Sequence, residues 1–146
     1  MASTFQKFDQ FIADAMAGVH KLKTGTTDVL KILLTNTAPV AGNAVKADLT
    51  EISAGNGYTA GGNSIGTITA GQTSGTFKIS GGSDPVITAA GGSIGPFRYA
   101  VLYNDTPTSP ADPLIGFWDY GSATTLNDTE PLTLDLDQTN GLFTAA

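Results

Sequence analysis

Apolar residues near the start of the chain recur at three- and four-residue steps, which is the period of an amphipathic helix. The pattern predicts a helix over about residues 4–22, with Ser3 and Gln6 as a capping box and Gly25 as the stop. Two interpretations of its apolar stripe stay open, because the stripe can pack on the domain's own core or dock onto a neighbouring subunit. The stripe consists of Phe5, Phe8, Ile12, Ala15, Met16, Val19 and Leu22.

From residue 28 onward the helical period is lost, and short strand-like runs alternate with turn residues. The predicted elements of this middle part are a central strand over 28–35, one or two helical turns within 45–52, a hairpin of 67–69 with 76–80 around the turn 71–75, and a strand over 85–89.

The last third predicts a pair of long strands, over residues 97–103 and 114–120, around the loop 104–113. Strict alternation in the first strand directs Phe97, Tyr99, Val101 and Tyr103 to one face and Arg98, Ala100 and Leu102 to the other. Leucines 132, 134 and 136 alternate with polar residues, which predicts a strand with one buried face. Asn140 and Gly141 favour a type I′ turn before a closing strand over 142–144.

These elements predict a mainly β protein, an antiparallel β-sandwich or barrel preceded by one N-terminal α-helix. The 146 residues fit a single domain spanning 1–146, with the helix at about 4–22 and the β-domain at about 28–146. Charged residues make up 14% of the chain, against about 25% in an average globular protein, which favours protein–protein contact over a highly solvated surface.

Charge and cysteine content exclude several classes of partner and chemistry. The formal charge of −6, with seven acids and no Lys or Arg in residues 101–146, argues against a nucleic-acid partner. Zero cysteines exclude disulfides, thiolate nucleophiles and Cys-ligated metals, and fit assembly in a reducing cytoplasm. The start of the chain lacks a signal-peptide pattern, and no apolar run approaches the roughly 20 residues that span a membrane. We therefore expect no membrane partner.

Candidate catalytic patterns are present, but each lacks its context. His20 is the only histidine, and its place near the end of the predicted helix favours a structural role over a general base or metal ligand. The pattern Gly-x-Ser-x-Gly occurs at 62–66 and 91–95 without a following helix or a later histidine. Residues 55–60 fit a loose dinucleotide pattern without the strand–turn–helix setting. We interpret all three glycine patterns as turns.

Carboxylates offer two further hypotheses. Glu51 and Glu130, the only glutamates, are a candidate glycosidase pair, although nothing in the sequence fixes their separation. Residues 135–141 resemble a calcium loop, but Thr139 and Asn140 occupy the positions that need Asp or Asn and then Gly. A solvated strand face entering a turn is the favoured interpretation, with calcium bridging between subunits by Asp128, Asp135 or Asp137 as the alternative.

Half of the twelve aromatic residues lie between residues 97 and 120. Large amphipathic rings serve equally in a core, an interface hot spot or a carbohydrate-stacking platform. We predict Phe97, Val101 and Trp118 in the core, with some tyrosine hydroxyls near the rim. The ring set that would form the alternative, a sugar platform, is Tyr99, Tyr103, Trp118 and Tyr120.

Three segments together carry a family resemblance: LTNTAPV at 34–40, AGNGYTAGG at 54–62, and the pair FRYAVLYND and PLIGFWDYG at 97–105 and 113–121. In order and spacing they resemble a group of small virion proteins of tailed bacteriophages and prophages, from about residue 5 to residue 143. The resemblance implies a capsid decoration (cement) protein without enzymatic activity, made in the cytoplasm of the host bacterium and carried on the capsid surface of the virion. No catalytic residues carry over, because the shared segments are turns and strands.

The resemblance implies two partners, the major capsid protein and further copies of the chain itself in a homotrimer, and no cofactor or metal. The alternative is a tail-associated or host-glycan-binding virion protein. We expect the predicted helix or the loop after residue 103 to face the shell. The candidate interface residues are Phe5, Phe8, Ile12, Tyr103, Asp105, Thr106, Pro107, Pro110 and Tyr120.

Overall fold

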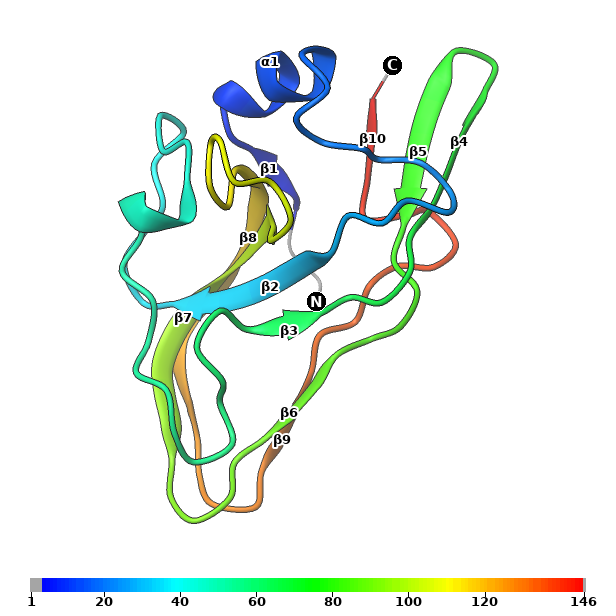
Figure 1. The fold of residues 1–146 in the computed structure, drawn as a ribbon. Coiled ribbons are helices and arrows are strands. Elements are labelled where there is room, and N and C mark those ends of the chain that lie inside the picture. The colour runs from blue at the N-terminus through cyan, green and yellow to red at the C-terminus, as the bar shows by residue number, and fades with distance from the viewer. Residues whose placement is uncertain (1–3, 146) are drawn as a thin grey trace.

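A computed structural model describes residues 4–145 of the chain (Figure 1). Its elements in order are β1 (Gln6–Lys7), α1 (Gln10–Met16), β2 (Leu30–Thr35), the 3₁₀ turn η1 (Lys46–Asp48), β3 (Asn63–Ser64), β4 (Thr69–Thr73), β5 (Thr76–Ser80), β6 (Val86–Thr88), β7 (Ile94–Asn104), β8 (Leu114–Leu126), β9 (Pro131–Thr133) and β10 (Phe143–Ala145).

The strands form three antiparallel sheets around the long hairpin of β7 and β8. The largest sheet has the order β1-β8-β7-β2-β3, and smaller sheets pair β10-β5-β4 and β6-β9. The predicted class is confirmed, since the described residues are mainly β with antiparallel sheets and one α-helix. They form no closed barrel and are compatible with a β-sandwich. The predicted turn within 45–52 is the 3₁₀ turn η1.

Both faces of the five-stranded sheet are buried. On one side, Ala100 and Leu102 of β7 belong to the main core, together with alternate residues of β2 and residues from the smaller sheets. On the other side, Val101 and Tyr103 join Phe8 in a second cluster. Burying a large apolar side chain contributes about 1.5–3 kcal/mol. The β7–β8 hairpin is therefore stabilised from two directions.

The predicted alternation in β7 holds for residues 99–103 but is wrong for Phe97. The register of β7 on β8 shifts between Phe97 and Tyr99, which marks an irregularity of the β-bulge kind. The extra residues lie in β8, since Phe97 pairs with Thr124 and Tyr99 pairs with Asp119. At this irregularity the alternation of β7 is broken: Phe97 packs in the main core, whereas Tyr99 packs against the second cluster. The predicted core residues Phe97, Val101 and Trp118 are all buried.

The hairpin of β4 and β5 turns more tightly than the sequence predicts. Its strands extend to Thr73 and Thr76, and the two turn residues Ser74 and Gly75 both have positive φ, at 51° and 83°. That geometry is typical of a two-residue hairpin turn, which matches the twist of the strands.

The C-terminal region departs from the predicted local hairpin. Leu134 and Leu136 are buried as their alternation predicts, although regular strand is confined to β9. The chain then turns at Gly141 (φ 89°), and β10 pairs with β5, not with residues 132–136. The strand partner is thus about sixty residues away in sequence, a distance at which turn chemistry gives no information.

The predicted helix over 4–22 is wrong in extent. Residues 6–7 form β1 and pair with β8 in the register Gln6 to Phe117, so α1 begins only at Gln10. It ends at Met16, short of the predicted end at residue 22, because Gly18 and not Gly25 ends the helix, with φ 81°. The N–H groups of Gly18 and Val19 donate to the carbonyls of Ala15 and Asp14 at 3.2 and 2.9 Å. This is a Schellman cap.

Candidate interaction surface

The α-helix α1 presents apolar side chains to solvent and a carboxylate to the interior. Met16 is 85% exposed and Ile12 is 43% exposed, whereas Asp14 is buried. Ala13 and Ala17 are exposed beside them. In a surface helix of a globular protein the apolar stripe normally faces the core. Of the two interpretations of the predicted stripe, core packing is therefore wrong for Ile12 and Met16.

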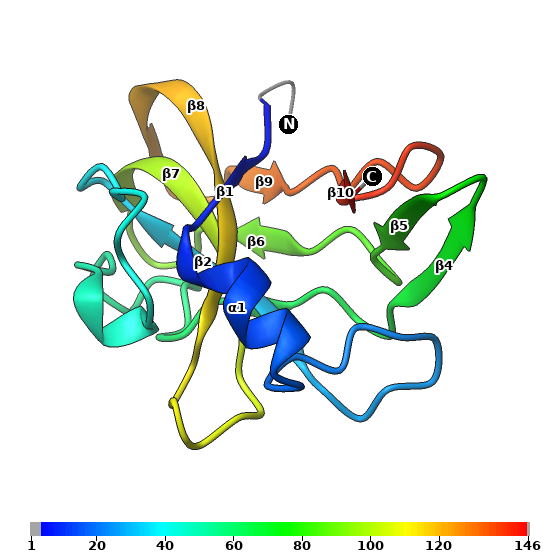
Figure 2. The same ribbon diagram turned by 90° about the horizontal axis from the view of Figure 1, so that it is seen from above.

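A loop beside the start of α1 carries a further exposed apolar residue. Val40 is 60% exposed, and its segment is held beside the start of α1 by a hydrogen bond from Asp9 N–H to the Ala41 carbonyl at 2.9 Å. We call the combined surface the helix patch. It consists of Ile12, Ala13, Met16, Ala17 and Val40. Figure 2 shows α1 from above, crossing in front of β8 on the outside of the fold.

A buried polar cluster explains why Asp14 faces inward. Its carboxylate accepts a hydrogen bond from Gln10 Nε2 at 2.9 Å and, with Asp28, acts electrostatically on the His20 imidazole. Asp28 accepts hydrogen bonds from Lys21 N–H at 2.9 Å and from Asn104 Nδ2 at 2.7 Å. Buried polar groups require such partners, and they gather on one side of α1. The inner face of α1 thus combines Asp14, beside this cluster, with Phe11 and Ala15, which pack on the main core.

The loop after β7 is fastened to the scaffold at its base. Asp105 N–H donates to the Val29 carbonyl at 2.8 Å, and Val29 N–H donates to Thr106 Oγ1 at 2.8 Å. The Asp105 carboxylate pairs with Lys31 Nζ at 2.8 Å. These contacts leave a short tip, residues 108–111, exposed.

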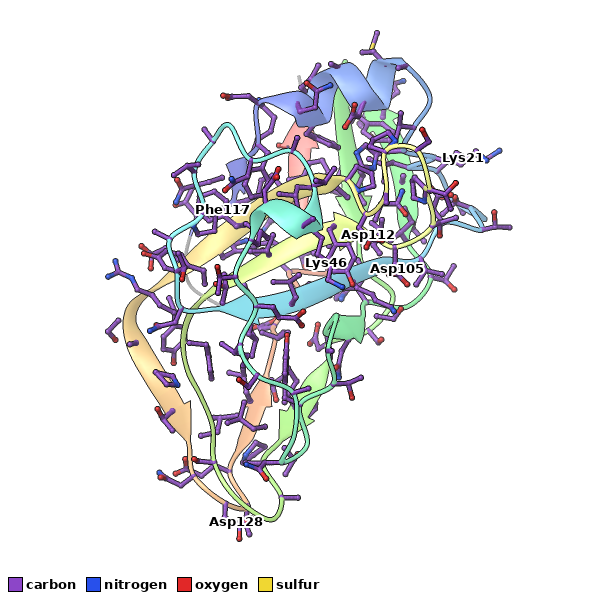
Figure 3. All side chains as sticks on the ribbon, turned by 60° about the vertical axis from the view of Figure 1, so that its left-hand side comes forward. Lys21, Lys46, Asp105, Asp112, Phe117 and Asp128 are labelled. Carbon is purple, nitrogen blue, oxygen red and sulfur yellow. The ribbon has the colours of Figure 1, made fainter. Side chains whose placement is uncertain are left out.

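This loop lies near α1 and far from the turn between β8 and β9. Lys21, Asp105 and Asp112 all lie in the half of the molecule that holds α1, whereas Asp128 marks the opposite end (Figure 3). Of the predicted loop residues, Thr106 and Pro110 are exposed, and Asp105 and Pro107 are half-buried. They remain available for contact at the end of the molecule that carries the helix patch.

Two predicted interface residues, Phe8 and Tyr103, are fully buried. Phe8 packs at 5.2 Å from the ring of Phe117, and the Tyr103 hydroxyl donates to the Gly61 carbonyl at 2.7 Å. Phe5 is half-buried against Trp118 and Phe143, with ring centroids at 5.3 and 4.7 Å. These three residues hold the fold together, and Phe8 and Tyr103 cannot contact a partner on its surface.

The predicted carbohydrate platform is not assembled. Trp118 is 8% exposed and Tyr103 is fully buried, whereas Tyr99 is half-buried against the second cluster. Only Tyr120 of the four rings is well exposed, at 48%. Stacking on a sugar requires an open ring face, so these rings do not form a common binding surface.

The glycine-rich segment 54–62 has a structural explanation. Glu51 Oε1 accepts the Tyr58 hydroxyl at 2.7 Å and Gly61 N–H at 2.6 Å, which fastens the segment to the end of β2. A Cβ at Gly62 (φ 75°) would overlap the Ile32 carbonyl oxygen. The glycines therefore permit close approach of two backbones.

The candidate catalytic groups are likewise engaged in local structure. Glu51 serves the segment just described, and Glu130 accepts the Asn127 N–H at 2.7 Å in a surface turn. Ser64, in the first Gly-x-Ser-x-Gly copy, accepts Gly66 N–H through its hydroxyl at 3.1 Å, as in a Ser/Thr turn. Asp137 accepts Thr139 and Asn140 N–H in the turn that had resembled a calcium loop.

Residues 4–145 contain no group of three or more His, Asp or Glu side chains placed to hold a metal ion. Within the same range, no helix combines the length and apolar character that a membrane crossing demands.

Comparison with known proteins adds no assignment. No family model matches the chain, and neither a curated protein nor a solved structure matches it.

Sequence reasoning missed Met16 and Val40 as interface candidates. Met16 belongs to the predicted apolar stripe, and the stripe's period gives no information about which of its members face outward. Val40 lies in a loop segment that carries no periodic signal. The signal that would have shortened the helix was Gly18, a residue suited to the left-handed cap position.

Proposed function

We propose that the chain is a structural protein of a tailed-bacteriophage virion, one that decorates the capsid by binding between capsomers as a homo-oligomer. The major capsid protein and further copies of the chain are its partners. The observation that best supports this is the helix patch, an uncharged apolar surface on the outer face of a helix that buries Phe11 and Asp14 on its inner face. Exposed apolar patches of this kind mark protein–protein contact sites. The family resemblance supplies the virion setting.

The size of the helix patch favours repeated, symmetric attachment. Burying Ile12, Met16 and Val40 contributes about 4 kcal/mol, given about 1.5–3 kcal/mol for a fully exposed apolar side chain. Association costs about 4–15 kcal/mol in lost translational and rotational freedom. One patch alone is therefore too weak to hold the chain on a shell. A trimer multiplies the contact without enlarging the chain.

The tip of the loop 104–113 offers a second contact at the same end of the molecule. It is pre-ordered, because Asp112 N–H donates to the Pro107 carbonyl at 3.3 Å and Thr108 pairs with Ala111. A pre-ordered loop loses little conformational entropy on binding. The helix patch and this tip together form the surface that we assign to the shell.

The proposal is tested by adding purified protein to expanded, undecorated heads of the phage that encodes it. Met16→Asp places a charge in the helix patch, and Val86→Asp is the matched control because Val86 is 53% exposed on β6, outside the patch. We expect the wild type and Val86→Asp to decorate heads equally, and Met16→Asp to lose at least about tenfold in affinity. Near-ultraviolet circular dichroism verifies that both variants are folded.

Two results would overturn the proposal. The first is a wild-type protein that is strictly monomeric by light scattering and has no head affinity. The second is undiminished decoration by folded Met16→Asp, which would remove the helix patch from the contact. The alternative, glycan binding by a tail component, rests on Tyr120 alone and predicts low copy number in the virion, whereas a decoration protein is abundant.

A further inference from the structure

The only histidine of the chain lies at the centre of a buried junction between three segments. His20 follows α1 and is 5% exposed, Asp28 precedes β2, and Asn104 ends β7. Asn104 Nδ2 lies 3.3 Å from His20 Nδ1 and 2.7 Å from Asp28 Oδ2. The side chain of Asn104 thus joins the connection after α1 to the base of the loop 104–113.

Neighbouring hydrogen bonds fix which way the Asn104 amide points. Its oxygen accepts Thr106 N–H at 3.2 Å, and its nitrogen donates to the Asp28 carboxylate. Turning the amide over would place oxygen against carboxylate and remove the acceptor of Thr106. The nitrogen must therefore face His20, and His20 Nδ1 must accept.

This arrangement selects one form of the imidazole. With Nδ1 as acceptor, the ring is neutral and its proton lies on Nε2. Among the described residues, His20 Nε2 is the one buried side-chain nitrogen or oxygen without a hydrogen-bond partner. Protonation at Nδ1 would set two donors against each other at the contact with Asn104. The junction can close only around neutral histidine.

We propose that the His20–Asn104–Asp28 junction is an acid-sensitive latch, closed at neutral pH, whose opening releases the connection after α1 and the base of the loop 104–113. The charged groups facing the imidazole are Asp14 on α1 and Asp28 before β2, and both favour its protonated form. On the loop side, Asp105 is paired with Lys31 at 2.8 Å, and the group that faces the ring is the neutral amide of Asn104.

Burial lowers the pKa of His20 below its usual 6.5, and this outweighs the opposing effect of Asp14 and Asp28. A histidine whose pKa is lowered on folding binds more protons in the open or unfolded state. The latch therefore contributes stability that is fully present above about pH 6.5 and is lost as the pH falls through the folded-state pKa. The device is independent of the proposed virion role.

The test compares the wild type with His20→Asn. The amide oxygen of Asn occupies roughly the position of Nδ1, so it can accept from Asn104 but does not titrate. Hydrogen exchange of the Thr106 and Lys21 amides reports on the latch, because these N–H groups donate to Asn104 and Asp28. Protection factors are measured between about pH 7.5 and pH 5 and corrected for intrinsic exchange.

We expect protection at both amides to fall in the wild type by up to about tenfold per pH unit between about pH 6.5 and the folded-state pKa, to level off below it, and to stay level throughout in His20→Asn. The same acid dependence in both proteins, or none in the wild type, would refute the latch. If His20→Asn does not fold, nitrogen-15 spectra of the wild-type imidazole decide. A proton on Nε2 and a titration midpoint below 6.5 support the latch, whereas a proton on Nδ1 or a midpoint at or above 6.5 overturns it.

Discussion

Replacing Tyr58 by Phe removes a single hydroxyl from the interior and tests how the segment 54–62 is held. That hydroxyl accepts Leu34 N–H at 3.0 Å and donates to Glu51 Oε1 at 2.7 Å. An interior N–H left without an acceptor costs about 1–3 kcal/mol, and a hydrogen bond to a charged group contributes about 1.5–3 kcal/mol. Because Glu51 keeps its bond from Gly61 N–H, we take the lower part of both ranges. The expected loss is about 3 kcal/mol.

Urea unfolding followed by the fluorescence of Trp118, the single tryptophan, measures this loss. With a denaturant slope of about 2 kcal/mol/M, the midpoint should fall by about 1.5 M. Tyr120→Phe is the matched control, because Tyr120 is half exposed, and its change should stay within about 0.5 kcal/mol. A Tyr58→Phe variant within about 1 kcal/mol of the wild type would refute the view that this hydroxyl fastens the segment to β2.

Three further outcomes are expected. Gly62→Ala should lower soluble yield and thermal stability sharply, because φ is 75° and a Cβ would overlap a backbone carbonyl of β2. Gly71→Ala is the control, since a Cβ there meets open space, and it should leave both unchanged. Thr24 Oγ1 donates to the Ala70 carbonyl and accepts from the Ala70 N–H on the edge strand β4. Thr24→Val leaves these edge groups free to pair with another chain, so light scattering should show concentration-dependent self-association. Burial raises the pKa of the Tyr103 hydroxyl, so the folded state holds this side chain in its neutral form. The contribution of neutral Tyr103 to the free energy of unfolding is complete below pH 10 and is lost at higher pH. Its tyrosinate absorbance should therefore rise together with unfolding, and ionisation in a folded chain would contradict this.

Local patterns predicted the strands well where the partner lies nearby in sequence. The hairpin β7–β8, the strand β5 and the central strand β2 fall where period and turn residues place them, whereas β4 extends into the predicted turn. In β7 the predicted alternation of side chains between the two faces is correct from Tyr99 onward but not for Phe97. The register shift between them leaves no reliable trace in the sequence.

The candidate surface was predicted less well, and α1 shows why. Helical period identifies a stripe but not the direction in which it points, and here Phe11 packs inward against Phe143, which lies far along the chain. Likewise, β10 pairs with a strand that no neighbouring residue indicates. Phe8 is an interface candidate through its place in the helical stripe, and Tyr103 because aromatic rings suit interfaces and cores equally, and neither signal reveals that the side chain is buried.

The stacking of Phe5 on Phe143 has a consequence for how the chain is made. These rings lie 4.7 Å apart and nearly parallel, at 10°, and both pack against the main core. Their contact closes a loop of almost the full described length, and such long-range closure slows folding. A chain emerging from the ribosome can form the β7–β8 hairpin before β10 has been synthesised. It cannot complete its main core until Phe143 is available to pack against Phe5.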